Sequence, residues 1–307
     1  MKIIVTGAAG FIGKNFLLKA NKKWELYAVD RSTSELNKFV KENNLANIKT
    51  FECNLSDKDE VKKLFDKLNC TFDVCLYLAA NSDPNFSIQF PGEDLAANTA
   101  ALVNFLSCLA AKKFIFFSSG AVYHGLSGPV NPKTKLNPLL PYSISKYASE
   151  QYIKFFNTTK SIENYLIVRF FGAYGPYEPP RKITSKLIRS ILIEGKDSYE
   201  VYGDGENLID IMYIDDTIDC ILAMIKNKNV RNEVFDLCTG KPVAINSFVI
   251  NIARILKRGE IKISHNGVSH ENIMFVVSPK KAISLFGFKQ KVTLEKGIIG
   301  LAKFLKK

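Results

Sequence analysis

The chain has 307 residues, a hydrophobic content of 47% and a formal net charge of +12. This length and composition are typical of a globular protein with a large core and one or two domains. The basic residues stand in ones and twos, which argues against nucleic-acid binding, and no run of about 18 apolar residues is present to cross a membrane. The six cysteines form no Cys-x-x-Cys pair and only three histidines occur, so we expect no metal site, no disulfide framework and a cytoplasmic protein.

Short β-rich runs alternate with amphipathic stretches through the first half of the chain. Strands are predicted over residues 2–7, 25–30, 48–54, 73–80, 113–119 and 164–171, and helices over 11–20, 33–44, 57–68, 92–112 and 142–160. Apolar strands that alternate with helices predict an α/β fold with a doubly wound parallel sheet of the Rossmann type.

The sequence pattern changes after residue 172, where loops and helices are expected to dominate. We therefore expect a dinucleotide-binding domain over residues 1–171. A smaller α/β region over 172–307 is expected to bind mainly the substrate, with some segments returning to the first domain.

A glycine-rich turn joins the first predicted strand to the first predicted helix. In "VTGAAGFIG", residues 5–13, the glycines are Gly7, Gly10 and Gly13. They allow a tight turn and a close approach to a pyrophosphate, while the helix amino terminus offers free N–H groups to the anion. Asp30 ends the second predicted strand, where an acid binds ribose hydroxyls. These features predict a dinucleotide site.

The residues around this turn bear on the choice of cofactor. Asp30 favours NAD, whereas the adjacent Arg31 would suit the 2′-phosphate of NADP, so we expect NAD with NADP as the alternative. Asn54 follows the third strand and is a candidate for contact with the adenine. Residues 78–81 are expected to pass beneath the phosphates and ribose. The further candidate cofactor-binding residues are Phe11, Ile12, Leu55, Leu78, Ala79, Ala80, Asn98, Tyr142 and Lys146.

A serine ends the fifth predicted strand, and "YSISK" at residues 142–146 opens the next helix. Ligands of open α/β sheets lie beyond the carboxyl ends of the strands, and residues four apart share one face of a helix. Ser119, Tyr142 and Lys146 are therefore expected in one cleft. With twelve tyrosines in a lysine-rich chain, roughly one Tyr-x-x-x-Lys arises by chance. The motif therefore indicates a catalytic pair only because it follows the predicted strand and turn that place it at the cleft.

These motifs together resemble the extended short-chain dehydrogenase/reductase family, in its nucleotide-sugar epimerase/dehydratase branch. "RFFGAYGP" (169–176) and "YGDGENLIDIMYIDD" (202–216) are similar to two further signatures of that branch. The resemblance, over about residues 1–240, implies an NAD(P)-dependent enzyme that transfers hydride at a sugar carbon of a nucleotide-diphosphate sugar. A C4 epimerase is placed first. A keto-sugar reductase or a 4-dehydrogenase is the alternative, and a non-catalytic dinucleotide sensor is less favoured.

The resemblance also implies roles for the catalytic candidates. Tyr142 would remove and return a hydroxyl proton, Ser119 would hold the reacting oxygen, and Lys146 would support the phenolate and anchor the nicotinamide ribose. A free tyrosine has a pKa near 10, so its phenolate needs roughly 4 kcal/mol of stabilisation to act near pH 7. Related enzymes pair the helices that correspond to 92–112 and 142–160, which implies a homodimer.

Several positions depart from the family pattern. Gly120 and Ala121 stand where the 4,6-dehydratases have an Asp-Glu pair, which argues against dehydration. His124 replaces a glycine and is expected to be a hydrogen-bonded structural residue. Gly172 and Ile209 replace an Asn and an Arg that usually bind the substrate, which weakens phosphate binding there.

Basic residues after the "PYEPP" loop are the suggested replacement for that lost charge. They are Arg181, Lys182 and Lys186. The full set of candidate substrate-binding residues is Ser82, Ser119, Gly120, Ala121, Gly172 and Arg181.

Overall fold

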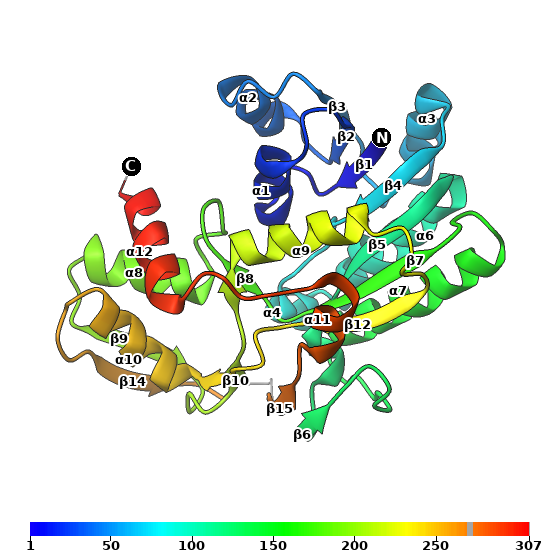
Figure 1. Cartoon of the computed structure of the whole chain (residues 1–307). Helices are drawn as coiled ribbons and strands as arrows, with labels where there is room; N and C mark the ends of the chain where they lie inside the picture. Colours follow the sequence, from blue (N-terminus) through cyan, green and yellow to red (C-terminus); the bar gives the residue numbers. More distant parts are fainter. Residues whose placement is uncertain (269–272, 307) are drawn as a thin grey trace.

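The computed structural model describes residues 1–268 and 273–306. Its centre is a seven-stranded sheet with the strand order β12-β7-β5-β4-β1-β2-β3 (Figure 1). The strands are β1 (Lys2–Thr6), β2 (Glu25–Asp30), β3 (Ile48–Glu52), β4 (Phe72–Tyr77), β5 (Ala111–Ser119), β7 (Tyr165–Phe170) and β12 (Glu233–Leu237). All neighbouring strands pair in parallel, which confirms the predicted fold class.

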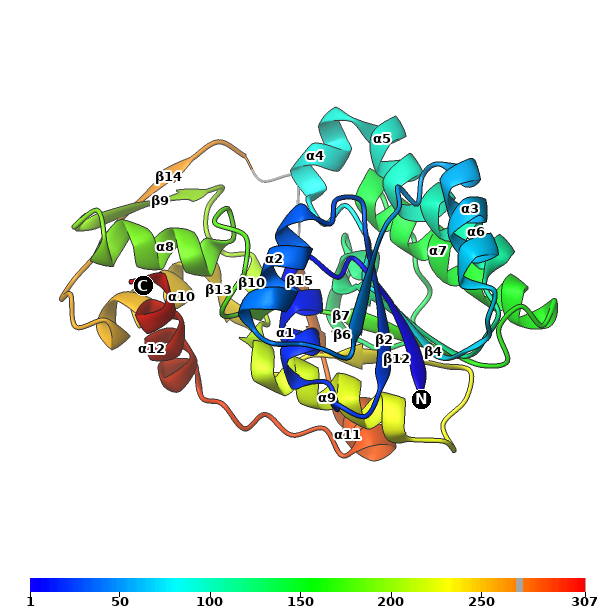
Figure 2. The same cartoon turned by 90° about the horizontal axis from the view of Figure 1, so that it is seen from above.

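Helices cover both faces of this sheet (Figure 2). One face carries α1 (Phe11–Lys19), α2 (Ser34–Glu42), α9 (Ile214–Lys226) and α11 (Lys280–Phe286), and the other carries α3 (Lys58–Leu68), α6 (Ala101–Cys108) and α7 (Pro141–Thr158). Successive strand residues face opposite sides, so Ile3 and Val5 belong to one core and Ile4 to the other. Burial on both sides explains why these strands are apolar along most of their length.

The predicted helix over 92–112 is a continuous helix over residues 91–108 that consists of three segments. They are α5 (Pro91–Leu95), a π-helical turn (Ala96–Ala100) and α6, which ends at Cys108. An additional helix, α4 (Pro84–Gln89), precedes them, and the Asp83 carboxylate caps it by accepting hydrogen bonds from the backbone N–H groups of Asn85 and Phe86. No helix in the described ranges combines the length and apolar character that a membrane span requires.

The second half of the chain contains more strands than expected. Besides β12, two-stranded sheets pair β8 (Ala173–Tyr174) with β11 (Met212–Tyr213), β10 (Leu208–Ile209) with β13 (Val243–Ala244), β9 (Ser198–Tyr202) with β14 (Lys262–Asn266), and β15 (Met274–Val277) with β6 (Ser127–Val130). Loops and helices were expected to dominate after residue 172, and this part of the predicted α/β region has more strands than that expectation allowed. These strands have two to five residues, too few to show a clear alternation.

A separate apolar core lies beside the main sheet (Figure 1). It is formed by α8 (Ile183–Leu192), α10 (Ile245–Ile255) and α12 (Leu294–Leu305) together with β9. The division of the chain at residues 171 and 172 stays a prediction, because β12, α9 and α11 from the second half pack in the first core.

Candidate active site

A cleft of about 1030 Å³ lies at the carboxyl ends of the parallel strands. The ends of β2, β4, β5 and β7 form its floor, and residues 208–211 form part of the opposite wall. The predicted site residues that line it are Gly7, Gly10, Phe11, Ile12, Gly13, Asp30, Arg31, Asn54, Leu55, Leu78, Ala79, Ala80, Ser82, Ser119, Gly120, Ala121, Tyr142, Gly172 and Arg181. Asn98 and Lys146 lie outside this lining, and both are buried.

The glycine turn between β1 and α1 is packed too closely for side chains. Gly7 has a φ of +65°, and a Cβ there would lie 2.8 Å from the backbone nitrogen of Ala79. A Cβ on Gly13 would lie 2.5 Å from the carbonyl oxygen of Gly7. No side chain caps the amino terminus of α1, so its N–H groups are available to an anion in the cleft. This cradle fits a dinucleotide pyrophosphate.

The carboxylate at the end of β2 is held in place by backbone N–H groups. Asp30 accepts hydrogen bonds from the backbone nitrogen of Ala9 at 2.9 Å and from that of Arg31 at 2.8 Å. A fixed carboxylate at this point suits ribose hydroxyls and repels a 2′-phosphate, although the exposed Arg31 also lines the cleft. The residues therefore fit NAD better than NADP.

The candidate catalytic residues come from the end of β5 and the first two turns of α7. Tyr142 lies in the first turn of α7, where its backbone nitrogen donates a hydrogen bond to Ser87 Oγ at 3.1 Å. Ser119 ends β5, and its Oγ accepts a hydrogen bond from the backbone nitrogen of Ala121 at 3.1 Å. Both residues line the same cleft. The structure thus brings together a serine and a tyrosine that are far apart in sequence.

Lys146 lies one turn along α7 from Tyr142 and points to the end of β5. Its Nζ donates a hydrogen bond to the carbonyl oxygen of Phe117 at 2.9 Å and lies 5.9 Å from the centre of the Tyr142 ring. Burial lowers the pKa of Lys146 to about 8, while the negative charges of Asp94 and Glu150 raise it. Lys146 therefore remains mostly an ammonium at neutral pH, close to the tyrosine ring.

The basic residues suggested for the substrate lie in different places. Arg181 lines the cleft, and its Nε donates to Asp83 Oδ2 at 3.1 Å. Lys182 also lines the cleft. Lys186 does not, and its Nζ lies over the ring of Tyr199, 5.9 Å from the ring centre. Arg181 and Lys182 are thus the suggested cations that reach the cleft.

The position of the missing family asparagine has no room for a side chain. Gly172 has a φ of +129°, and a Cβ there would lie 2.9 Å from Ile211 Cγ2. Ile209 and Ile211 also line the cleft. Gly172, Ile209 and Ile211 thus form an apolar part of the cleft wall.

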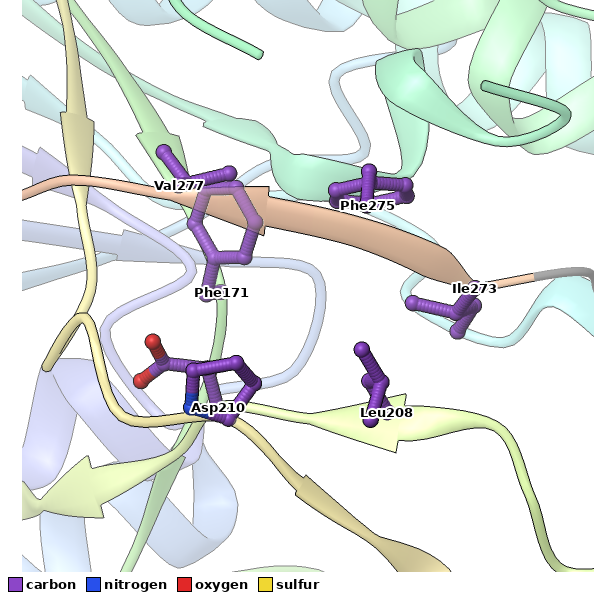
Figure 3. A pocket seen from close by; sticks show the side chains of 7 residues that line it. Phe171, Leu208, Asp210, Ile273, Phe275 and Val277 are labelled. Carbon is purple, nitrogen blue, oxygen red and sulfur yellow. The ribbon is translucent and has the colours of Figure 1, made fainter. Parts of the chain in front are cut away.

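A side cavity of about 20 Å³ continues this apolar wall (Figure 3). Its lining consists of Phe171, Leu208, Asp210, Pro242, Ile273, Phe275 and Val277. The Asp210 carboxylate is already engaged by the backbone nitrogens of Thr239 and Gly240, at 2.7 and 2.8 Å. The cavity has about the volume of one water molecule and shares most of its lining with the cleft, so it is a recess of the same site.

His124 is buried, as expected of a structural residue, but one of its ring nitrogens lacks the expected hydrogen bond. The residue is 8% exposed, lines the cleft and has a buried Nδ1 with no hydrogen-bond partner among the described residues. Burial lowers its pKa to about 4, so the ring is neutral at physiological pH. The expectation of a hydrogen-bonded structural histidine was thus wrong for Nδ1.

A buried ion pair behind the site is a feature that sequence reasoning missed. Arg169 donates to both carboxylate oxygens of Glu150, at 3.0 and 2.8 Å, and to the Tyr123 hydroxyl at 2.8 Å. That hydroxyl donates to Asp236 at 2.9 Å. The pair joins α7 to β7 and β12. The one indication of this ion pair in the sequence is that Glu150 follows Lys146 by four residues and so lies on the same face of the helix.

A Rossmann-type sheet with a glycine cradle and a Tyr-x-x-x-Lys helix at one cleft defines an enzyme of the extended short-chain dehydrogenase/reductase type. Residues 3–238 match the model of the NAD dependent epimerase/dehydratase family, and the chain belongs to that family. The resemblance inferred from the sequence motifs is thereby confirmed.

Relatives of the chain match it over nearly its whole length. It is 31% identical to a putative UDP-glucose 4-epimerase of Methanocaldococcus jannaschii, covering 99% of this chain and 98% of that protein. It is 26% identical to the UDP-glucuronate 4-epimerase of Thermodesulfobacterium geofontis, with the same coverage of 99% and 98%. The structure of UDP-glucose 4-epimerase with UDP-glucose from Thermotoga maritima has the same fold, with a TM-score of 0.88, 24% identity and coverage of 100% and 99%.

Proposed function

We propose that this protein is an NAD-dependent epimerase that inverts C4 of the sugar in a nucleotide-diphosphate sugar. The observation that carries the proposal is the position of Lys146, whose buried ammonium lies beside the Tyr142 ring at the edge of the cleft. The 4-epimerases among the relatives support the choice of reaction and of substrate class.

The side chains have distinct tasks in this reaction. Tyr142 takes the proton of the C4 hydroxyl and later returns it, with the Lys146 ammonium favouring the phenolate. Ser119 holds the reacting oxygen by a hydrogen bond. NAD, when bound, supplies the hydride acceptor and donor. Gly120 and Ala121 offer no acid and base beside Ser119, so removal of water is not favoured.

The diphosphate of the substrate is assigned to the basic rim of the cleft. Arg181 and Lys182 line the cleft, and Ser82 lies within reach of the Arg181 guanidinium, at 3.5 Å from Nη2. A guanidinium forms paired hydrogen bonds with phosphate oxygens and can replace the arginine that Ile209 displaces.

The test is turnover by the purified protein without added cofactor. UDP-glucose and UDP-glucuronate are offered first, and the sugar stereochemistry is followed by NMR. We expect one of these substrates and its C4 epimer to reach the same mixture from either side, with bound NAD detected after denaturation. Net consumption of NADH or NADPH with a keto sugar would instead establish the reductase.

We further propose a homodimer that forms through α5 and α7. Large apolar side chains are exposed on these helices, namely Leu95 (52%), Ile144 (47%), Tyr152 (45%) and Phe155 (57%). Such a patch is typical of an interaction surface. Sedimentation at micromolar concentration should show a dimer, and a Phe155→Glu variant should show a monomer.

All six cysteines are free, which suits the proposed cytoplasmic location.

A further inference from the structure

Asp94 has a fully buried carboxylate that accepts three side-chain hydrogen bonds. Its exposed fraction is 0%. Oδ1 accepts from Asn81 Nδ2 at 2.9 Å and from Asn98 Nδ2 at 2.8 Å, and Oδ2 accepts from Ser145 Oγ at 2.7 Å. All three donors are neutral groups, so the hydrogen bonds stabilise the charge without cancelling it.

The three donors come from separate segments that form the site. Asn81 lies in the loop after β4 and lines the cleft. Asn98 lies in the π-helical turn, and Ser145 lies on α7 between Tyr142 and Lys146. The carboxylate therefore joins the cleft loop, the turn and the catalytic helix at one point.

The negative charges of Asp94 and Glu150 both raise the pKa of Lys146, and Glu150 is the one that is paired with a basic side chain. Glu150 is paired with Arg169 at 2.8 Å. None of the ion pairs in the described part of the chain includes Asp94. Asp94, which accepts a hydrogen bond from Ser145, the residue before Lys146 in α7, is therefore the one of the two carboxylates whose charge is not offset by a basic side chain in the described ranges.

The groups that contact Lys146 in the described part of the chain are neutral. They are the Phe117 carbonyl oxygen at 2.9 Å, the Phe116 ring at 4.9 Å from its centre, and the Tyr142 ring at 5.9 Å. An ammonium that is 4% exposed in such surroundings depends on a counter-charge to stay protonated.

We propose that Asp94 is a positioning residue: its buried carboxylate supplies the counter-charge for the Lys146 ammonium and joins Asn81, Asn98 and Ser145 into one unit beneath the cleft. The inference rests on the proposed function for its catalytic meaning. The protonation of Lys146 is nevertheless measurable without any substrate.

The test compares Asp94→Asn with Ser145→Ala in the full-length protein. Asparagine keeps the shape and hydrogen-bonding capacity of Asp94 and removes its charge, whereas Ser145→Ala removes one hydrogen bond and keeps the charge. The titration of Lys146 is followed by NMR of the ¹³Cε signal in lysine-labelled protein, assigned with a Lys146→Arg variant. We expect Asp94→Asn to lower the titration midpoint by about one pH unit. Ser145→Ala should leave it in place.

The alkaline limb of the turnover profile should move with this midpoint in Asp94→Asn. A titration midpoint equal to that of the wild type would overturn the proposal. If Asp94 had a purely structural role, its replacement would change the stability of the fold and leave the titration of Lys146 unchanged. If Asp94→Asn does not fold, Asp94→Ser gives the same comparison, with space for a water molecule to accept the freed hydrogen bonds. If the wild type turns over no nucleotide sugar, the proposed function fails, while the NMR titration still decides the role of Asp94.

Discussion

Arg181 and Asp83, 98 residues apart in the chain, form an ion pair with 3.1 Å between Nε and Oδ2. The pair joins the segment after β8 to the amino-terminal cap of α4 at the exposed rim of the cleft. A substrate diphosphate assigned to Arg181 must compete with Asp83 for the same guanidinium. The pair is therefore expected to weaken substrate binding.

Replacement of Asp83 by Asn should strengthen substrate binding. Asparagine is as good a helix cap as aspartate, so α4 is kept while the competing charge is lost. An exposed ion pair is worth up to about 1 kcal/mol, so KM should fall by up to about five-fold with little change in kcat. Arg181→Ala should raise KM instead, by about ten-fold. An unchanged KM in Arg181→Ala would remove this residue from the substrate site.

Replacement of Tyr142 by Phe should abolish most turnover. Loss of a positioned acid/base typically lowers kcat by about 10²- to 10⁴-fold. The ring is kept, so the affinity for NAD, measured by calorimetry, should stay near that of the wild type. Tyr202→Phe is the matched control, because Tyr202 is 57% exposed and lies outside the cleft lining, and this variant should turn over normally. Full activity in Tyr142→Phe would refute the proposed mechanism.

Replacement of Glu150 by Gln should destabilise the fold. Arg169 is 3% exposed and would be left as a buried charge without its carboxylate partner, which typically costs about 3–5 kcal/mol. The free energy of unfolding in urea measures this loss. Glu194→Gln breaks the exposed pair with Lys196 and should change stability by less than about 1 kcal/mol. Equal effects of the two substitutions would contradict the buried pairing.

Because of His124, the free energy of unfolding should fall as the pH is lowered. Its pKa in the folded protein is about 4, below the ordinary value of 6.5. As the pH falls from 6.5 to 4 the unfolded chain binds the proton first, so the folded state loses up to about 3 kcal/mol across this window. His124→Asn should lack this part of the pH dependence. Parallel curves of unfolding free energy against pH for the two proteins would show that the ring is not held neutral.

The parts of the fold that were predicted from sequence depend on local patterns. The glycine turn, Asp30 and the Tyr142–Lys146 spacing each lie within one strand–helix unit, where apolar runs and turn residues are informative. The π-helical turn inside 96–100 was not predictable, because its apolar pattern continues that of the flanking helices. The rule that ligands bind beyond the carboxyl ends of parallel strands indicated a cleft that Ser119 and Tyr142 line, while Lys146 lies outside its lining.

Contacts between distant segments could not be predicted from sequence. Asp94 is one of two acids in a helix of five residues, and its burial becomes evident only when Asn81 and Ser145 are seen around it. Arg181 was proposed from its charge alone, and its partner Asp83 has no sequence signal other than a cap before a proline. Such pairs depend on tertiary placement, which no local pattern encodes.

The position of β12 has a consequence for biosynthesis. Residues 233–237 supply the outermost strand beside β7, and more than sixty residues of other structure precede them after β7 ends at Phe170. While the chain emerges from the ribosome, the backbone N–H and C=O groups on that side of β7 stay unpaired, an edge that attracts other strands. A nascent chain that is stalled before Glu233 is synthesised should therefore depend on chaperones. It should not leave the ribosome as a compact, folded protein.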